Sequence, residues 1–182
     1  MTVMDKIRIS KKLSFHLRHA PDQLGITLGP GAWVAVDELL AALDAHGFRV
    51  QRADLDEVVA SNDKKRFAFD ETGTLIRANQ GHSVEVDLDL PVTDPPAVLY
   101  HGTVDRFLPA IERDGLQPMD RHHVHLSSTV DTARAVGARR GKPVILRVDA
   151  AAMAAAGFEF RVSANGVWLA DTVPPAFLTR LP

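Results

Sequence analysis

Apolar residues in the first part of the chain recur with the period of an α-helix. Ile9, Leu13 and Leu17 follow one another at intervals of four residues, which places them on one helical face. Ser10 is the expected N-cap of this helix, and the step from Ala20 to Pro21 is expected to end it. The pattern therefore predicts an amphipathic helix near the start of the chain.

Two more helices are predicted downstream. The first covers about residues 36–46 and ends at Gly47, and its apolar face consists of Leu39, Leu40 and Leu43. The second starts at Asp54, because Asp54 and Glu57 have the spacing of a capping box. Its buried side chains are expected to be Leu55, Val58 and Val59.

The apolar period then changes from helical to alternating. Residues 66–69 and 74–77 alternate and flank the segment 70–73, which predicts a hairpin with a four-residue turn. Three helices followed by a hairpin is the element order of a winged helix. That order is common among nucleic-acid binders, although a fold does not define a function.

A proline-rich segment divides the chain. Residues 91–97 contain three prolines and no helical or strand period, so we expect an extended connector there. The part after it is richer in strand, with strands expected at 98–101, 124–127, 144–148 and 166–169 and helices at 104–114, 129–140 and 150–156. We predict an α+β protein with one domain at 1–90, a connector at 91–97 and a second domain at 98–182.

Composition excludes several classes of protein. The chain has 182 residues, no cysteine and a formal net charge of −2. It therefore has no disulfide, thiolate nucleophile or cysteine zinc site. The sequence shows neither a signal sequence nor an apolar run of membrane-spanning length, so we expect a cytoplasmic protein without a membrane partner. Six of the 21 cationic residues are lysine and the remaining 15 are arginine, whose guanidinium matches phosphate geometry.

Several short polar motifs could carry chemistry, but each has an ordinary structural explanation. Arg18-His19 ends the first helix, where cations are common. Three cations precede the hairpin at 64–66, and polar donors and acceptors gather at 79–83. Residues 122–125 contain three histidines, which also permits a zinc hydrolase, although no H-E-x-x-H motif or clear third ligand accompanies them and we expect no metal.

The motifs become specific when they are taken in order along nearly the whole chain. This order resembles the RNA 2′-phosphotransferase family, that is, the tRNA 2′-phosphotransferases and their bacterial relatives. The segments that carry the resemblance are 10–19, 63–67, 76–83, 100–103, 115–127, 137–139, 165–169 and 173–175.

The resemblance implies a fold and a reaction. It implies an N-terminal winged-helix lobe that binds RNA phosphate and a C-terminal mixed β lobe of the ADP-ribosyltransferase type that binds NAD⁺. The RNA 2′-phosphate attacks C1″ of NAD⁺ and expels nicotinamide, and the ribose O2″ then attacks that phosphate. The products are RNA with a free 2′-OH and ADP-ribose 1″,2″-cyclic phosphate, so NAD⁺ is consumed and no metal is required.

The resemblance also assigns residues. The family's catalytic set corresponds to Arg18, His19, Arg66 and Arg139, with His19 either a fourth phosphate contact or a proton-transfer group. The NAD-binding set corresponds to His101, Gly102, Thr103, Arg121, His125, Ser127 and Val167. The set near the RNA phosphate corresponds to Lys65, Gln80, Gly81, His82 and Ser83. We expect a monomer that takes an RNA bearing an internal 2′-phosphate.

Two alternatives of different kinds remain. The same site could ADP-ribosylate a terminal phosphate of RNA or DNA and stop after the first step. Alternatively, the chain could be a winged-helix regulator that binds duplex and does not turn over NAD⁺. Residues 1–90 carry 11 basic and 14 acidic side chains, and this acidic balance counts against the regulator.

Overall fold

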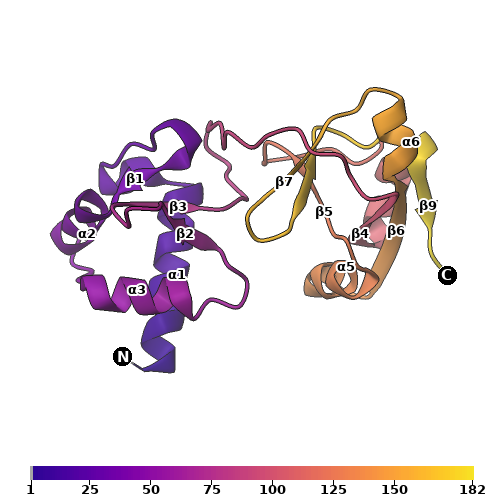
Figure 1. The fold of residues 1–182 in the computed structure, drawn as a ribbon. Helices are drawn as coiled ribbons and strands as arrows, with labels where there is room; N and C mark the ends of the chain where they lie inside the picture. Colours follow the sequence, from indigo (N-terminus) through magenta and orange to yellow (C-terminus); the bar gives the residue numbers. More distant parts are fainter. Residues whose placement is uncertain (1) are drawn as a thin grey trace. The chain divides into compact units, whose positions relative to one another are not determined.

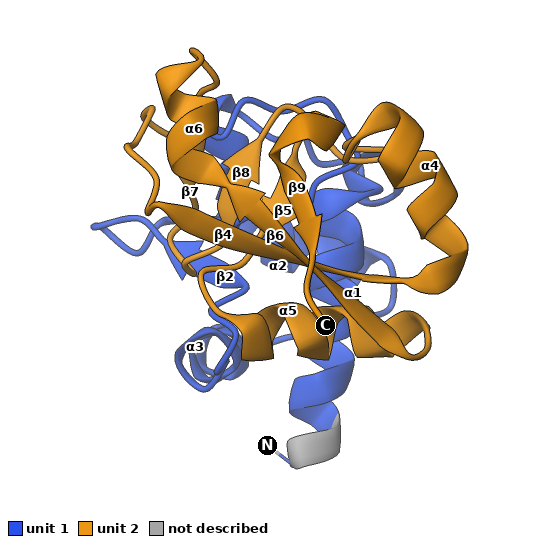
Figure 2. Cartoon of the chain, turned by 90° about the vertical axis from the view of Figure 1, so that its right-hand side faces the viewer, with its two compact units in different colours: residues 1–89 blue, residues 90–182 orange. Residues whose placement is uncertain are grey.

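The fold of this chain, a computed structural model that describes residues 2–182, consists of two compact units (Figure 1). Unit 1 is Met1–Asp89 and unit 2 is Leu90–Pro182, and Figure 2 colours them separately. Helices and small antiparallel sheets occur in both units, which confirms the prediction of an α+β protein. Within residues 2–182, no helix is both long and apolar enough to cross a membrane.

Unit 1 combines three α-helices with one three-stranded antiparallel sheet. The sheet order is β1-β3-β2, and the predicted hairpin is confirmed as β2 and β3, with Phe67 opposite Ala78 and Phe69 opposite Ile76. The sequence pattern missed β1, which pairs Val34 with Ile76. The elements are α1 (Val3–Arg18), β1 (Val34–Ala35), α2 (Val36–Ala45), α3 (Arg52–Ala60), β2 (Phe67–Phe69) and β3 (Leu75–Ala78).

Two helix starts differ from the sequence prediction. Thr2, and not Ser10, is the N-cap of α1, because its side chain accepts from the Asp5 amide while the Asp5 carboxylate accepts from the Thr2 amide. Helix α3 starts at Arg52, because Asp54 pairs in the same reciprocal way with Gln51. Asp54 is therefore the third helical residue rather than the first.

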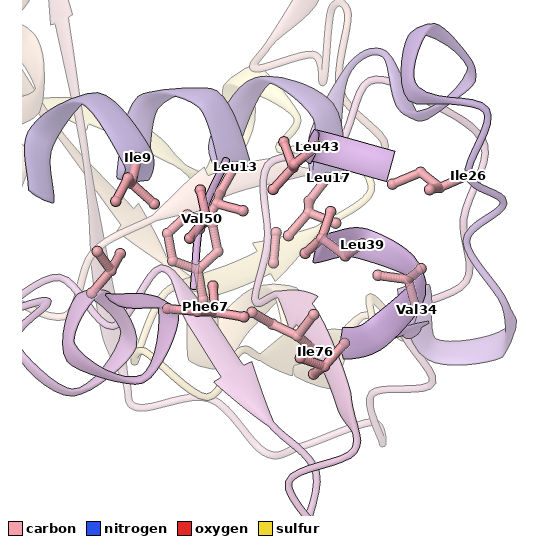
Figure 3. Close-up of a cluster of buried hydrophobic side chains, with 14 of the residues drawn as sticks. Ile9, Leu13, Leu17, Ile26, Val34, Leu39, Leu43, Val50, Phe67 and Ile76 are labelled. Atoms are coloured by element: carbon pink, nitrogen blue, oxygen red, sulfur yellow. The ribbon is translucent and has the colours of Figure 1, made fainter. Parts of the chain in front are cut away.

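The core of unit 1 joins all three helices to the sheet. Figure 3 shows Leu13 and Leu17 of α1 among side chains of α2 and the sheet. Leu13, Leu17, Leu39, Leu43, Leu55 and Ile76 are fully buried. Burial of these side chains is the main way in which the amphipathic pattern stabilises the fold of unit 1. Each large apolar side chain contributes roughly 1.5–3 kcal/mol to the free energy of folding relative to an exposed one.

Arg77 connects β3 to two loops of unit 1. Its guanidinium lies 4.5 Å from the centre of the Trp33 ring and donates to the carbonyls of Gly31 at 3.2 Å and Leu88 at 3.3 Å. Burial lowers the pKa of Arg77, and the nearby charge of Asp89 opposes that effect. The side chain therefore has a structural role.

Unit 2 contains two three-stranded antiparallel sheets. One has the order β4-β6-β9 and the other β5-β8-β7. The residues of the predicted connector, 91–97, contain neither helix nor strand. The elements are β4 (Val98–Val104), α4 (Leu108–Asp114), β5 (Val124–Leu126), α5 (Val130–Gly137), β6 (Pro143–Asp149), α6 (Ala150–Ala155), β7 (Phe160–Val162), β8 (Trp168–Ala170) and β9 (Leu178–Arg180), with a 3-10 turn at Ala138–Arg140.

A single backbone pair joins the two sheets of unit 2. Tyr100 of β4 and Ser127, just after β5, exchange hydrogen bonds of 2.8 Å in each direction. Leu99, Leu126 and Phe160, which come from both sheets, are buried in one apolar cluster. The polar residues of the motifs at 100–103 and 121–127 therefore lie where the two sheets meet.

Arg77→Met is expected to lower the free energy of unfolding of unit 1 by about 2 kcal/mol, because it removes the charged donor to two carbonyls and the contact with Trp33. Urea denaturation followed by Trp33 fluorescence in a Trp168→Phe background measures this effect. Arg49→Met is the control, because the Arg49 side chain is 82% exposed. Equal effects of the two substitutions would contradict the structural role of Arg77.

Candidate active site

The end of α1 is bound to the segment that follows β3. The backbone amide of Ser83 donates to the Arg18 carbonyl at 2.9 Å, and His19 Nδ1 lies 2.8 Å from Ser83 Oγ. His19 is the C-cap residue of α1, and its amide still donates to the Phe15 carbonyl. The structure thus brings Ser83 next to Arg18 and His19, although Ser83 follows His19 by 64 residues in the sequence.

The segment 80–83 makes a tight turn to reach α1. Gly81 has a φ of +88°, a value that favours glycine, and the next side chain, His82, is buried. Gln80 directly follows Asn79. The backbone amide of Asn79 continues the β2–β3 pairing, because it donates to the Arg66 carbonyl at 2.9 Å. This path places the predicted phosphate set of residues 80–83 between Arg66 and the end of α1.

Two asparagines that the sequence analysis did not assign hold Arg66. Asn62 Oδ1 accepts from the Arg66 guanidinium at 3.3 Å and from the Lys64 amide at 3.2 Å. The buried Asn79 donates through Nδ2 to the Lys65 carbonyl at 2.6 Å. Lys65 itself is exposed and has a φ of +41°, a left-handed conformation that these contacts stabilise. Asn79 lies within the polar motif 76–83 and Asn62 directly precedes the motif 63–67, but only the fold shows that they contact Arg66 or its neighbour.

In unit 2, the His101 ring is oriented by a backbone carbonyl. His101 Nδ1 lies 3.0 Å from the His125 carbonyl, which can only accept, so Nδ1 carries the proton. Burial lowers the pKa of His101, the bond to His125 opposes this, and the charges of Arg140 and Arg121 lower it further. The ring is therefore neutral at pH 7, and Nε2 is its acceptor nitrogen.

His125 is oriented by Arg121. The Arg121 guanidinium donates to His125 Nδ1 at 2.9 Å, so Nδ1 is the acceptor in this contact. Burial lowers the pKa of Arg121, and the charges of Arg140 and Arg139 lower it further. Three guanidinium groups therefore lie close enough to repel one another, an arrangement that a bound anion would relieve.

Arg140 belongs to this cluster although the sequence analysis did not assign it. Its guanidinium carbon lies 5.7 Å from the centre of the Phe107 ring, which Arg106 also contacts at 4.9 Å. This contact anchors the 3-10 turn Ala138–Arg140 that carries Arg139. The adjacent arginines in the sequence were the only signal that could have indicated Arg140.

The glycine of the motif His101-Gly102-Thr103 is explained by helix packing. A Cβ at Gly102 would lie 1.7 Å from the Ala133 carbonyl oxygen of α5, and one at Gly137 would lie 2.9 Å from the Thr103 carbonyl oxygen. Gly102 thus permits the close approach of the α5 backbone to β4. Because the turn with Arg139 follows α5 directly, this contact also positions Arg139.

Ser127 and Val167 lie at the ends of the strands that carry the site. The β5–β8 pairing ends with Leu126 opposite Trp168, and Ser127 and Val167 are the residues next to this last pair. Val167 is held by Ser163, whose buried hydroxyl contacts both the amide and the carbonyl of Val167. The side chain at this position is apolar and supplies no acid or base.

The three histidines at 122–125 do not act together as a metal site. Only His125 lies within β5, and His123 Nε2 faces Asp171 at 3.7 Å. Across residues 2–182, no group of three or more histidine, aspartate or glutamate side chains is placed to hold a metal ion. The structure therefore gives no support to the zinc alternative.

Together, these features define an α+β protein in which the segment 79–83 links Arg66 to Arg18 and His19 in unit 1, while imidazoles lie near guanidinium groups in unit 2. A family model described as "RNA 2'-phosphotransferase, Tpt1 / KptA family" matches residues 4–172. The chain belongs to the RNA 2′-phosphotransferase family, as the order of its motifs indicated.

Relatives of the chain carry the same family name. The chain is 60% identical over 173 residues to a "Probable RNA 2'-phosphotransferase" of Trichormus variabilis, covering 95% of each protein. It is 60% identical over 179 residues to one of Streptomyces griseus, covering 94% of the chain and 95% of the relative. One of Burkholderia lata is 51% identical over 178 residues, which cover 97% of the chain and 92% of the relative. The expectation of a transferase is confirmed.

Gly102→Ala is expected to lower the free energy of unfolding of unit 2 by about 3 kcal/mol, because the new methyl group must displace the backbone of α5. Thermal unfolding followed by Trp168 fluorescence in a Trp33→Phe background reports on this unit. Gly157→Ala, in the same unit, is the control, since its Cβ would meet nothing within 4 Å and only its φ of +94° opposes the change. A Gly102→Ala protein as stable as that control would refute the packing role.

His101 is expected to make unit 2 less stable as the pH falls below about 6.5. The pKa of His101 is lowered in the folded protein, so the unfolded chain binds the proton more readily and acidification favours unfolding. Unfolding midpoints between pH 8 and pH 5.5 should fall more steeply for the natural protein than for His101→Gln. Parallel pH profiles would show that the imidazole is not held in its neutral form.

Proposed function

We propose that this protein is an NAD⁺-dependent RNA 2′-phosphotransferase that removes an internal 2′-phosphate from RNA. Beyond family membership, one observation carries the proposal. Unit 2 holds two oriented imidazoles, those of His101 and His125, near the guanidinium groups of Arg121, Arg139 and Arg140. Ring nitrogens suit ribose hydroxyls and guanidinium groups suit phosphates, so this set fits a dinucleotide and a phosphate.

The two units are proposed to divide the substrates. Unit 1 has the element order helix, strand, two helices and hairpin, which supports a winged-helix lobe at 1–90 that binds RNA phosphate. Unit 2 has two antiparallel sheets that meet at the Tyr100–Ser127 pair, which supports an ADP-ribosyltransferase-like lobe at 98–182. Residues 91–97 serve as the connector.

The proposed reaction has two steps. An oxygen of the RNA 2′-phosphate forms a bond to C1″ of NAD⁺, and the C1″–N bond breaks with its electron pair leaving on nicotinamide. The O2″ hydroxyl then forms a bond to phosphorus, while the bond from phosphorus to RNA O2′ breaks. The proton lost by O2″ is matched by the proton gained at O2′, which yields 2′-OH RNA and ADP-ribose 1″,2″-cyclic phosphate.

Arg18, Arg66 and Arg139 are assigned to the phosphate. Both steps redistribute negative charge on phosphate oxygens, and a guanidinium that keeps its proton stabilises that charge throughout. Asn62 and the backbone of Asn79 hold Arg66, so its guanidinium is directed before substrate binds. Such preorganisation lowers the barrier because no reorientation is needed during the reaction.

His19 is assigned to the second step. Its ring is held through Nδ1 by Ser83, an arrangement that suits either a fourth contact to the phosphate or transfer of the proton between O2″ and O2′. A pH–rate profile separates these roles, because only a proton carrier contributes its own pKa to the second step. In either case, His19→Ala leads to accumulation of ADP-ribosylated RNA.

The remaining motif residues are assigned to binding. His101, Arg121, His125 and Ser127 contact NAD⁺, while Gly102, Thr103 and Val167 shape its site. An apolar Val167 suits this reaction, because the nucleophile is already an anionic phosphate and needs no carboxylate base. The residues proposed to surround the RNA phosphate are Lys65, Gln80, Gly81, His82 and Ser83.

A product assay tests the proposal. The protein is incubated with a short RNA that carries one internal 2′-phosphate, with and without NAD⁺, in the presence of EDTA. The expected result is NAD⁺-dependent loss of the phosphate with release of ADP-ribose cyclic phosphate. A stable ADP-ribose group that remains on a terminal phosphate, without loss of the 2′-phosphate, would instead assign the site to terminal-phosphate ADP-ribosylation.

Arg139→Ala is expected to reduce kcat/KM in this assay about 10²–10³-fold, because one charged contact to the reacting phosphate is lost. The fold should be retained, since the Arg139 side chain is exposed at the end of a turn. Arg134→Ala, which removes an exposed cation of α5, is the matched control. A loss of activity common to both variants would argue against a direct role for Arg139.

A further inference from the structure

Unit 1 contains a groove that the proposed catalytic and phosphate-binding residues do not account for. One wall is the side of α1 between Lys6 and Ser14, and the other is the end of α3 with the loop from Ser61 to Arg66. The volume of the groove is about 560 Å³. Helices α1 and α3 pack side by side, and the loop leaves α3 toward β2 (Figure 1). The groove lies entirely within unit 1.

The lining of the groove carries excess positive charge. Four cationic residues, Lys6, Lys11, Lys64 and Arg66, line the groove together with one carboxylate, that of Asp63. Of these cations, Lys6 forms an ion pair with Glu57. Residues 1–90 are acidic as a whole, with 11 basic and 14 acidic side chains, so the cations here are a local concentration.

The groove leads toward Arg18 and Arg66, two of the arginines assigned to the reacting phosphate. Lys11, Ser14 and Arg18 lie three and four residues apart, and such a spacing places them along one side of α1. The opposite wall ends at Arg66. From Lys6 to Ser14 the helix rises about 12 Å, which accommodates more than one nucleotide of an extended strand.

The chemistry of the lining favours a sugar–phosphate backbone over bases. Ser10 and Ser14 supply hydroxyl groups that can donate to phosphate oxygens, whereas the Ser61 hydroxyl donates to the Glu57 carbonyl. Among the described residues that line the groove, none is aromatic, so bases would find no ring to stack on. Lysines and hydroxyls that contact phosphates position a strand without reading its sequence.

We propose that this groove binds the backbone phosphates of single-stranded RNA next to the 2′-phosphorylated nucleotide. The inference rests on the proposed function and extends it, because it makes the enzyme recognise strand length as well as the 2′-phosphate. Recognition is independent of sequence, so any unpaired RNA segment with an internal 2′-phosphate suits the groove.

The test compares a dinucleotide with a ten-nucleotide RNA, each carrying one 2′-phosphate. The double variant Lys11→Gln/Lys64→Gln is expected to raise KM for the longer RNA about tenfold and to leave kcat/KM for the dinucleotide within about twofold. Binding of the longer RNA, measured by fluorescence anisotropy, should lose salt dependence by about 0.7 in log–log slope for each lysine removed.

Lys12→Gln is the matched control. It removes the same charge one position along α1, where the lysine lies over the Phe48 ring outside the groove. Equal effects of the control and the groove variants on the longer RNA would overturn the inference, as would an equal loss on both substrates. Failure of the natural protein to process either RNA would refute the proposed function instead, and the anisotropy measurement would still test the groove.

Discussion

The hydrogen bonds made by the backbone of residues 79–83 are the interaction on which unit 1 depends for its candidate site. The backbone amide of Asn79 continues the β2–β3 pairing by donating to the carbonyl of Arg66, the residue before β2. Four residues later, the backbone amide of Ser83 donates to the Arg18 carbonyl at the end of α1. A single short segment therefore fixes Arg66 relative to Arg18 and His19. Backbone hydrogen bonds suit this task because the cationic side chains repel one another. The backbone must therefore hold their positions against that repulsion.

Unit 2 meets the same requirement by close packing. Gly102 and Gly137 let α5 approach β4 until backbone touches backbone, so the turn that carries Arg139 and Arg140 has little freedom. The contact of Arg140 with Phe107 adds a second restraint on that turn. The imidazoles are oriented separately, His101 by a carbonyl and His125 by Arg121. In both units, residues outside the assigned catalytic set therefore determine where the charged groups lie.

Periodicity predicted the long elements because their apolar faces are local patterns. The helices around Leu13, Leu39 and Leu55 and the hairpin at 67–78 were found in this way. The strands β1, β7 and β9, of two or three residues each, were missed. β1 pairs with Leu75 and Ile76, and β9 pairs with residues 146–148, so these two strands form through partners far along the chain, which no local pattern records. The start of α1 was misplaced because several residues can cap a helix, and the chosen one depends on which side chains meet in space.

The sequence by itself determined the α+β class, the order of the motifs and, through that order, the family. These properties depend on residue identity and spacing along the chain, which the sequence contains in full. Only the tertiary structure decided why Gly102 is glycine, which asparagines direct Arg66, which nitrogen of His101 carries its proton, and that Arg140 lies near Arg121. Each depends on contacts between segments far apart in the chain, and no local pattern records which distant backbone or charge a side chain will meet.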